Sequence, residues 1–319
     1  MRNAVAIFPS TRRLMTPEPI RRIAIVGFGE AGGIIGNDLA EQGVDVAMFD
    51  ILLDAKETRE AMLAKARESK VRAKDSLADC LRDAELVISA VTASSSLDVA
   101  RDAAKTMHRG QIFVDINSVS PGTKRADAAY IERSGAHYVE SAVMAAVPPQ
   151  RLKVPMLLGG SYAAELAPRL ALLGMNATAV SDKIGVASAV KMCRSVMIKG
   201  MEALAVECLF AARRYGAEDA VLASLDFTYP QMGWREKLPD YLVSRVAEHG
   251  KRRAAEMREV AECLRDVGVQ PLMAEATAER QDWLADTMMG ENLKYKNIAP
   301  FSWIALAEML SAASSAKKK

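Results

Sequence analysis

The sequence predicts an α/β domain with a doubly wound parallel sheet, followed by an all-α domain. Short β-branched runs alternate with helical patterns in the N-terminal half. A glycine-rich turn at Gly27 follows the first of these runs. From Lys183 onward the strand pattern disappears and long amphipathic segments take over. We therefore expect four parts: a flexible N-terminal extension, 1–20; the α/β domain, 21–182; the helical domain, 183–314; and a basic tail, 315–319.

The first β/α unit carries the most specific pattern in the chain. A β-branched run, 21–26, stops at a G-x-G-x-x-G turn, and a helical pattern continues from Ile34. In a Rossmann-type fold the first glycine permits the tight turn, the second lets the backbone approach a pyrophosphate, and the third allows close helix packing. We expect this turn to bind a dinucleotide through six residues: Gly27, Phe28, Gly29, Glu30, Ala31 and Gly32.

The residue after the second predicted strand favours one cofactor. The run 43–49 has a strand pattern and ends at Asp50, near the position where Rossmann-type domains carry a ribose-binding acid. An acid there accepts hydrogen bonds from both ribose hydroxyls and repels a 2′-phosphate. Neither Ile51 nor Leu52 offers a cation to that phosphate. We therefore expect NAD rather than NADP.

Further alternating segments complete the predicted sheet. Because ligands of doubly wound sheets lie beyond the carboxyl ends of the strands, the loops 91–96 and 117–121 should border the cofactor. Val91, Thr92 and Asn117 are the candidates in these loops. Thr92 also suits a helix cap, which does not exclude cofactor contacts. The segments are strands 84–90, 111–116 and one that opens at 137–139, and helices 97–107 and 122–134.

The helical half begins with a long segment that carries a polar face. The segment 185–215, stopped by Gly216, is about 45 Å long at 1.5 Å per residue. Four polar residues recur along one face of it, which is either solvated or part of a site. These residues are Lys191, Ser195, Lys199 and Glu202. Further helices are predicted over 218–225, 238–267, 271–287 and 300–314.

Several of these motifs together resemble the β-hydroxyacid dehydrogenase superfamily, which includes 3-hydroxyisobutyrate and 6-phosphogluconate dehydrogenases. The resemblance runs in order from about residue 22 to 215. The segments 191–200 and 252–259 are similar to a phosphogluconate dehydrogenase-like branch with a C-terminal domain of unknown function, DUF1932. The motifs are the glycine turn, Asp50, the stretch 114–121, the pair Gly159-Gly160, and Gly185 with Lys191.

The resemblance implies NAD-dependent transfer of a hydride between a nicotinamide cofactor and a β-hydroxy acid or related alcohol. In that family the lysine at the position of Lys191 is the general acid/base, which takes the hydroxyl proton as hydride leaves the same carbon. Ser195 stands where the family has an asparagine, and we expect Ser195 and Ser118 to orient the substrate. Lys199, on the same helix face as Lys191, is a further substrate-binding candidate.

The segment that matches the family's carboxylate-binding loop departs from the family pattern. It spans 140–146, with Met144 at the serine position and alanines in place of both glycines. Ser141 and Met144 remain the substrate-binding candidates within it. Candidates to replace lost carboxylate contacts are Asn117, Ser118, Ser141, Arg151 and Lys153.

Two alternative functions stay open. One is an imine reductase on the same fold, although enzymes of that kind generally replace the lysine at position 191. The other is a non-catalytic NAD-dependent binding or scaffold protein, which the altered substrate loop favours and Lys191 opposes. On the predicted helix 238–267, His249 and Arg252 share a face. That pair suits either a plain surface pair or a group that reaches an active site across a dimer.

The overall composition excludes several partners. A formal charge of +2 provides no strong positive field for nucleic acid or an anionic membrane, and no run approaches the ~18 apolar residues of a membrane helix. The three histidines and four cysteines show no metal-ligand spacing, and the cysteines fit a reduced, cytoplasmic protein. We expect no metal, a small-molecule substrate and a homodimer or larger homo-oligomer. An apolar stripe suits either core or interface: Met197, Met201, Leu204 and Cys208.

Overall fold

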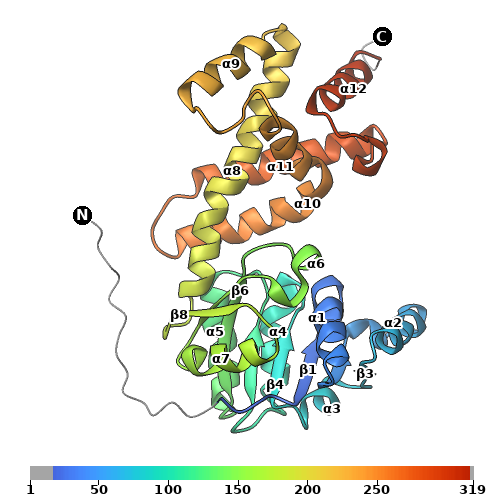
Figure 1. Ribbon diagram of the computed structural model, residues 1–319, viewed down its shortest axis with the longest axis vertical. Coiled ribbons are helices and arrows are strands. Elements are labelled where there is room, and N and C mark those ends of the chain that lie inside the picture. Colours follow the sequence, from blue (N-terminus) through green and yellow to red (C-terminus); the bar gives the residue numbers. More distant parts are fainter. Residues whose placement is uncertain (1–16, 317–319) are drawn as a thin grey trace.

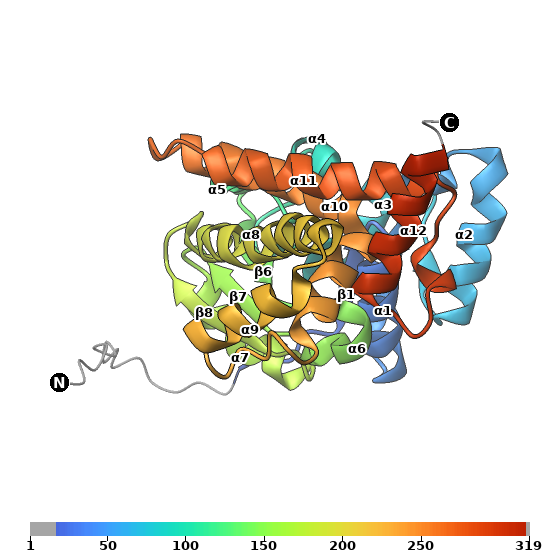
Figure 2. The same cartoon turned by 90° about the horizontal axis from the view of Figure 1, so that it is seen from above.

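The computed structural model describes residues 17–316 and shows an α/β part with a helical part above it (Figure 1). The helices α8, α10 and α11 pack together over the α/β part, as the view from above shows (Figure 2). Most of the expected N-terminal extension, and the last three residues of the expected basic tail, lie outside the described residues.

Within residues 17–316, eight strands form one sheet in the order β3-β2-β1-β4-β5-β6-β7-β8. Neighbouring strands are parallel except β6 and β7, so the predicted fold class is confirmed with one antiparallel pairing that the sequence patterns do not predict. The connection 144–155 contains Pro148 and Pro149. It forms a four-residue helix, α6 (Val147–Gln150), and one turn of 3-10 helix, η3 (Arg151–Lys153), both too short for a crossover helix. The strands are β1 (Arg22–Val26), β2 (Asp45–Phe49), β3 (Arg72–Ala73), β4 (Leu86–Ser89), β5 (Ile112–Asp115), β6 (His137–Val143), β7 (Met156–Gly159) and β8 (Ala177–Ser181).

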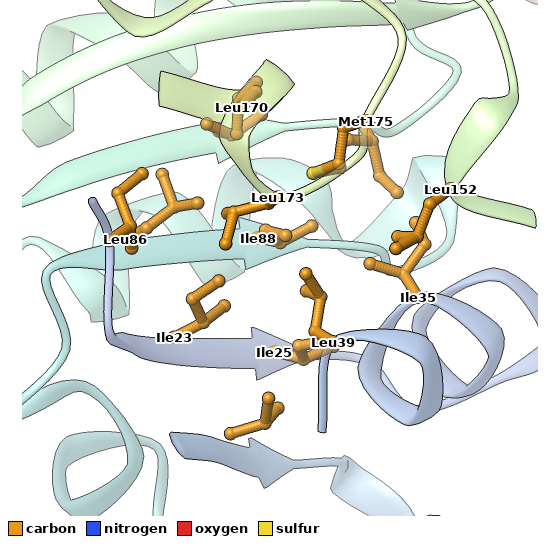
Figure 3. Close-up of a cluster of buried hydrophobic side chains, with 14 of the residues drawn as sticks. Ile23, Ile25, Ile35, Leu39, Leu86, Ile88, Leu152, Leu170, Leu173 and Met175 are labelled. Carbon is orange, nitrogen blue, oxygen red and sulfur yellow. The ribbon is translucent and has the colours of Figure 1, made fainter. Parts of the chain in front are cut away.

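Helices cover both faces of the sheet, because successive side chains of a buried strand point to opposite faces. On β1, Ile23 and Ile25 join one apolar cluster, whereas Ala24 and Val26 join the other. Figure 3 shows part of the first cluster around Ile23 and Ile25. The helices of this part are α1 (Glu30–Glu41), α2 (Lys56–Glu68), α3 (Leu77–Leu81), α4 (Ser96–Ala103), α5 (Pro121–Arg133) and α7 (Ala163–Leu172), besides α6.

The second part is helical and has no strand up to residue 316, as predicted. Its first helix, α8 (Val186–Tyr215), has 30 residues and ends at Gly216, whose φ of 66° is a left-handed conformation that glycine adopts without strain. The other helices are α9 (Glu218–Thr228), α10 (Leu238–Arg265), α11 (Leu272–Gly290) and α12 (Trp303–Ala316). Within residues 17–316, no helix is long and apolar enough to cross a membrane.

Two carboxylates join the helical part to the sheet. The fully buried Glu140 of β6 accepts hydrogen bonds of 2.6–3.2 Å from three backbone N–H groups within 185–188, at the start of α8. Glu259 of α10 accepts a hydrogen bond of 3.3 Å from the backbone N–H of Ser120, just after β5. A carboxylate at a helix N-terminus satisfies free N–H groups and favours the helix dipole. Glu140 therefore determines where α8 leaves the sheet.

Candidate active site

The glycine turn between β1 and α1 leaves open space beside one of its glycines. Gly27 has φ +87°, and a Cβ there would lie 2.5 Å from the carbonyl oxygen of Ala90. A Cβ at Gly32 would lie 2.0 Å from the carbonyl oxygen of Gly27. At Gly29, in contrast, a Cβ would meet nothing within 4 Å. The turn itself therefore requires glycine at 27 and 32, whereas Gly29 faces space that a ligand can occupy.

The start of α1 is suited to bind an anion. Gly29 is the N-cap residue and no side chain caps the helix, so the first-turn N–H groups, including those of Glu30 and Ala31, can bind a pyrophosphate. Lys65 of α2 donates hydrogen bonds of 2.7 Å to the carbonyl oxygens of both Phe28 and Gly29, which brings a positive charge to the turn. Sequence reasoning missed Lys65, because no local pattern relates it to a turn more than 30 positions earlier.

Asp50 lies beside the same turn and keeps its capacity to bind a ribose. One carboxylate oxygen accepts a hydrogen bond of 2.6 Å from the N–H of Phe28, and the other accepts one of 3.0 Å from the N–H of Leu52. Each oxygen can accept a second hydrogen bond. The side chains of Ile51 and Leu52 are exposed next to it and can pack against an adenine. The turn, the start of α1 and Asp50 together fit a dinucleotide.

Asn117 uses its whole side-chain amide inside the protein. Its oxygen accepts a hydrogen bond of 2.7 Å from the N–H of Val91, and its nitrogen donates to the hydroxyls of Ser89 and Ser96 at 3.0 and 3.1 Å. Asn117 therefore holds the loop after β4 in place, and its contact with a cofactor stays a prediction. Thr92 is exposed in that loop, and its hydroxyl contacts neighbouring serines without capping the next turn.

A buried polar network lies beneath these loops. Lys124 donates to the carboxylate and to the backbone carbonyl of Asp115, both at 2.9 Å, and Tyr138 donates to the same carboxylate at 2.7 Å. Asp127 accepts a hydrogen bond of 2.8 Å from Ser96. Burial and the nearby carboxylate of Asp115 raise the pKa of Asp127 to about 7. One carboxyl group under the site therefore titrates near neutral pH.

Lys191 reaches from α8 to the loop after β5. Its Nζ donates a hydrogen bond of 2.7 Å to the hydroxyl of Ser118. The pKa of Lys191 is lowered to about 8. Burial is the largest cause, the carboxylate of Glu256 opposes it, and the cations of Lys124 and Lys199 add to the lowering. A lysine with this pKa gains and loses protons near neutral pH, as a general acid/base must.

The polar face of α8 is buried, so the interpretation as a solvated face is wrong. Ser195, Lys199 and Glu202 are only 9%, 7% and 1% exposed. Lys199 pairs with Glu256 of α10 at 2.6 Å, and Glu202 forms a buried ion pair with Arg253 of the same helix. Helix α10 therefore covers this face, a tertiary contact that helical spacing in α8 does not reveal.

The segment that we expected to bind a substrate carboxylate offers no exposed side-chain donor. Ser141 belongs to β6, and its hydroxyl is buried without a hydrogen-bond partner among the described residues. Met144 is partly exposed, and its backbone N–H donates to the carbonyl of Pro155 at 2.9 Å. Arg151, a candidate replacement, instead pairs with Asp38 of α1. Among the predicted substrate contacts, the structure thus brings Ser118 to Lys191 but presents no hydroxyl of Ser141 to a ligand.

The doubly wound sheet, its glycine turn and the helical second part define a class of Rossmann-type, dinucleotide-binding proteins. Residues 22–180 match the NAD binding domain of 6-phosphogluconate dehydrogenase. Residues 212–284 match DUF1932, a domain of unknown function. The chain belongs to the β-hydroxyacid dehydrogenase-like family with a DUF1932 C-terminal domain. In the described part of the chain, no three His, Cys, Asp or Glu side chains gather as metal ligands.

Three relatives show how the similarity is distributed. The solved structure of a conserved hypothetical protein from Sinorhizobium meliloti is 36% identical, with a TM-score of 0.79 over 95% of this chain and 99% of that chain. An uncharacterised protein of Methanothermus fervidus is 30% identical over 80% of this chain and 96% of its own length. The mitochondrial 3-hydroxyisobutyrate dehydrogenase of Drosophila melanogaster is 24% identical over 67% of this chain and 65% of its own length. A relative with a named activity is thus more distant than the two without one.

Proposed function

We propose that the protein is an NAD-dependent oxidoreductase that transfers a hydride between its cofactor and a β-hydroxy acid or related alcohol, with Lys191 as general acid/base. One observation carries the proposal: the Lys191 amine, with its pKa lowered to about 8, is hydrogen-bonded to Ser118 at the carboxyl edge of the sheet. Ligands of doubly wound sheets bind along that edge, which also carries the glycine turn. Lys191 and the glycine turn therefore border the same edge of the sheet.

Each residue of the site has its own task in this proposal. The glycine turn and Asp50 would hold a nicotinamide cofactor, which would supply the hydride acceptor for the substrate carbon. Neutral Lys191 takes the hydroxyl proton, and a pKa of about 8 leaves about one-tenth of it neutral at pH 7. In the opposite direction the ammonium form donates a proton to the carbonyl oxygen. Ser118 holds the amine in place, and Ser195, one turn along α8, orients the substrate hydroxyl.

Asp50 supports NAD as the cofactor in preference to NADP. Its carboxylate is held by two backbone N–H groups, so it stays next to the ribose position. A negative charge there repels a 2′-phosphate, and the adjacent Ile51 and Leu52 supply no cation. Lys65, the cation at the turn, is already engaged by two carbonyl oxygens.

The environment of Lys191 also favours this activity over the two alternatives. A protein that only binds NAD gains nothing from a partly buried lysine with a lowered pKa, since burying an amine costs free energy. Imine reductases that resemble this family generally lack the lysine. The name of the Drosophila relative, 3-hydroxyisobutyrate dehydrogenase, supports a β-hydroxy acid as the substrate class.

The experiment that tests the proposal is a substrate panel followed by NADH absorbance. The purified protein is given NAD or NADP together with 3-hydroxyisobutyrate, 6-phosphogluconate, four-carbon sugar acids, and bulkier aryl β-hydroxy acids and alcohols. Ketones and imines form the reverse panel with NADH. We expect NADH formation from at least one β-hydroxy acid or alcohol.

Two variants assign the activity to the site. Lys191→Ala should lower turnover at least about 100-fold, the lower range for loss of a general acid/base, and leave NADH affinity unchanged. Lys105→Ala removes an exposed lysine of the same domain as the cofactor site and should change neither quantity. Undiminished turnover in Lys191→Ala would refute the role of Lys191. NADH binding without turnover in either panel would favour the scaffold alternative.

We further propose that the protein is a cytoplasmic homodimer that uses one face of α8. Val190, Met197 and Leu204 recur every seven residues on that face and are 44%, 67% and 56% exposed, so they form an apolar stripe that a second chain can cover. Cys193 and Cys208 are exposed free cysteines, as suits a reducing compartment. Light scattering should give twice the mass of one chain, and Met197→Glu should give a monomer. A wild-type monomer would contradict the dimer.

A further inference from the structure

A second group of charges lies beside Lys191 and contains more positive than negative charge. Lys199 of α8 and Arg252 of α10 both bind the carboxylate of Glu256, at 2.6 and 2.7 Å. Each carboxylate oxygen takes one cation, so the three side chains together carry one excess positive charge. Both cations lower the pKa of Lys191 and Glu256 raises it, which places all three within electrostatic reach of the reactive amine.

We propose that Lys199 and Arg252, gathered by Glu256, form a subsite for a compact anionic group of the substrate, either a carboxylate or a phosphate. This proposal rests on the proposed function, since it assigns the anionic end of the molecule whose hydroxyl meets Lys191. Lys199 lies two turns beyond Lys191 on the same face of α8, about 12 Å along the axis. Two long lysine side chains and a short-chain acid can span that separation.

Arg252 has free capacity to bind an anion. Its side chain is 59% exposed, and the one hydrogen bond shown for it within the described residues runs through a single Nη to Glu256. A guanidinium has five N–H donors and binds carboxylates and phosphates through two of them at once. A small molecule can reach this guanidinium because the side chain is exposed. Arg252 also borders a hollow of about 460 Å³ that is lined by α10, α11 and the segment 292–295.

Two other cations near the site are already neutralised. Lys124 is 1% exposed and paired with Asp115, and Arg151 is paired with Asp38. The segment 141–146, which matches the family's carboxylate loop, has no exposed side-chain donor. Lys199 is itself buried and paired with Glu256, so the exposed Arg252 presents the excess positive charge of the cluster to an anionic substrate group.

A purely structural role, joining α8 to α10, explains the cluster less well. The neighbouring pair of Glu202 and Arg253 already joins these helices, and it is buried and balanced, with one charge of each sign. The cluster around Glu256 differs on both counts, because it has an extra cation and that cation is exposed. A group built only to join two helices does not need an exposed second cation.

Isothermal titration calorimetry of the full chain with malonate, and separately with inorganic phosphate, tests the subsite. We expect Arg252→Gln to weaken binding at least about tenfold, the scale of a charged hydrogen bond. Glu256→Gln should strengthen binding, because it leaves two cations without a carboxylate. Arg258→Gln is the matched control, since Arg258 lies on the same helix, is also 59% exposed and is paired with Asp282.

The opposite signs of these effects separate the subsite from a general loss of folding. No binding of either anion to the wild type, equal loss in Arg252→Gln and Arg258→Gln, or weaker binding in Glu256→Gln would overturn the proposal. Stronger binding of malonate than of phosphate would assign the subsite to a carboxylate, and the reverse order would assign it to a phosphate.

Failure of the subsite and failure of the dehydrogenase function give different results. Anion binding needs no turnover, so it can support the subsite even when no substrate reacts. If an acid does react, Arg252→Gln should lower kcat/KM for the acid relative to its uncharged amide at least about tenfold, mainly through KM. An unchanged acid-to-amide ratio would overturn the subsite and leave the dehydrogenase intact.

Discussion

The side-chain nitrogen of Lys191 donates a hydrogen bond to the hydroxyl of Ser118 across 2.7 Å, although the two residues lie 73 positions apart. Ser118 follows β5, and Lys191 lies in the second turn of α8. The buried Glu140 of β6 holds the start of α8 through three backbone N–H groups. The distance between Lys191 and Ser118 therefore depends on how a carboxylate in the sheet anchors a helix of the second domain.

The first prediction concerns the pH dependence of turnover. Oxidation should become faster as the pH rises through about 8, because neutral Lys191 takes the proton, and reduction should decline over the same range. Glu256→Gln removes a carboxylate that raises the pKa of Lys191, so the pH profiles of oxidation and of reduction should both move to lower pH. Profiles of kcat/KM in both directions check this. If the pH profiles of kcat/KM were unchanged in Glu256→Gln, Lys191 would not be the titrating group.

The second prediction concerns cofactor choice. Asp50→Ala should weaken NADH binding at least about tenfold, because it removes a charged acceptor for the ribose hydroxyls. Binding of NADPH should weaken less, so the preference for NADH narrows. Fluorescence titration with both cofactors measures the ratio, and the exposed Asp54→Ala serves as the control. If Asp50→Ala left the ratio of NADH affinity to NADPH affinity unchanged, another group would have to bind the ribose hydroxyls.

The third prediction separates two glycines of the same turn. A Cβ at Gly29 meets no atom within 4 Å, so Gly29→Ala should fold like the wild type and bind NADH at least about tenfold more weakly, since the methyl group occupies ligand space. A Cβ at Gly32 would lie 2.0 Å from a backbone oxygen, so Gly32→Ala should lower the free energy of unfolding by about 2 kcal/mol or more. Urea unfolding and NADH titration of both variants check this. Equal effects of the two changes would contradict the geometry of the turn.

The fourth prediction concerns stability and pH. The pKa of Asp127 is raised to about 7 in the folded protein from an ordinary value of 3.8, so the folded state binds the extra proton. Its stabilising contribution is complete below about pH 4 and is lost as the pH rises through about 7. Asp127→Asn cannot ionise, so its free energy of unfolding relative to the wild type should rise by about 2.5 kcal/mol between pH 5 and pH 8, since the wild type loses about 1.4 kcal/mol per pH unit up to pH 7.

Urea unfolding of Asp127→Asn and the wild type at the two pH values measures this difference. The exposed Asp102→Asn is the control, since Asp102 is paired with Lys105 at the surface and its pKa is lowered instead of raised. An identical pH dependence in wild type and Asp127→Asn would show that Asp127 stays ionised in the folded protein.

Local patterns in the chain already predict much of the fold and of the cofactor site. The glycine turn and Asp50 depend on contacts within one β/α unit, and the long helices have a helical period that the chain itself displays. The strands β3, β7 and β8 escape prediction because they are short or have no clear alternation. The antiparallel course of β7 follows from a connection too short to form a crossover helix, which is a property of the packed sheet.

The sequence by itself therefore determined the class of fold, the dinucleotide turn and the helix face that carries Lys191. Only the tertiary structure decided that this face is buried, because α10 folds over it and brings Glu256 to Lys199. It also showed that Asn117 holds a loop, that Glu140 anchors α8 and that Lys65 reaches the glycine turn. These contacts join residues tens of positions apart, and neither helical nor strand periodicity records which distant side chains the folded chain brings together.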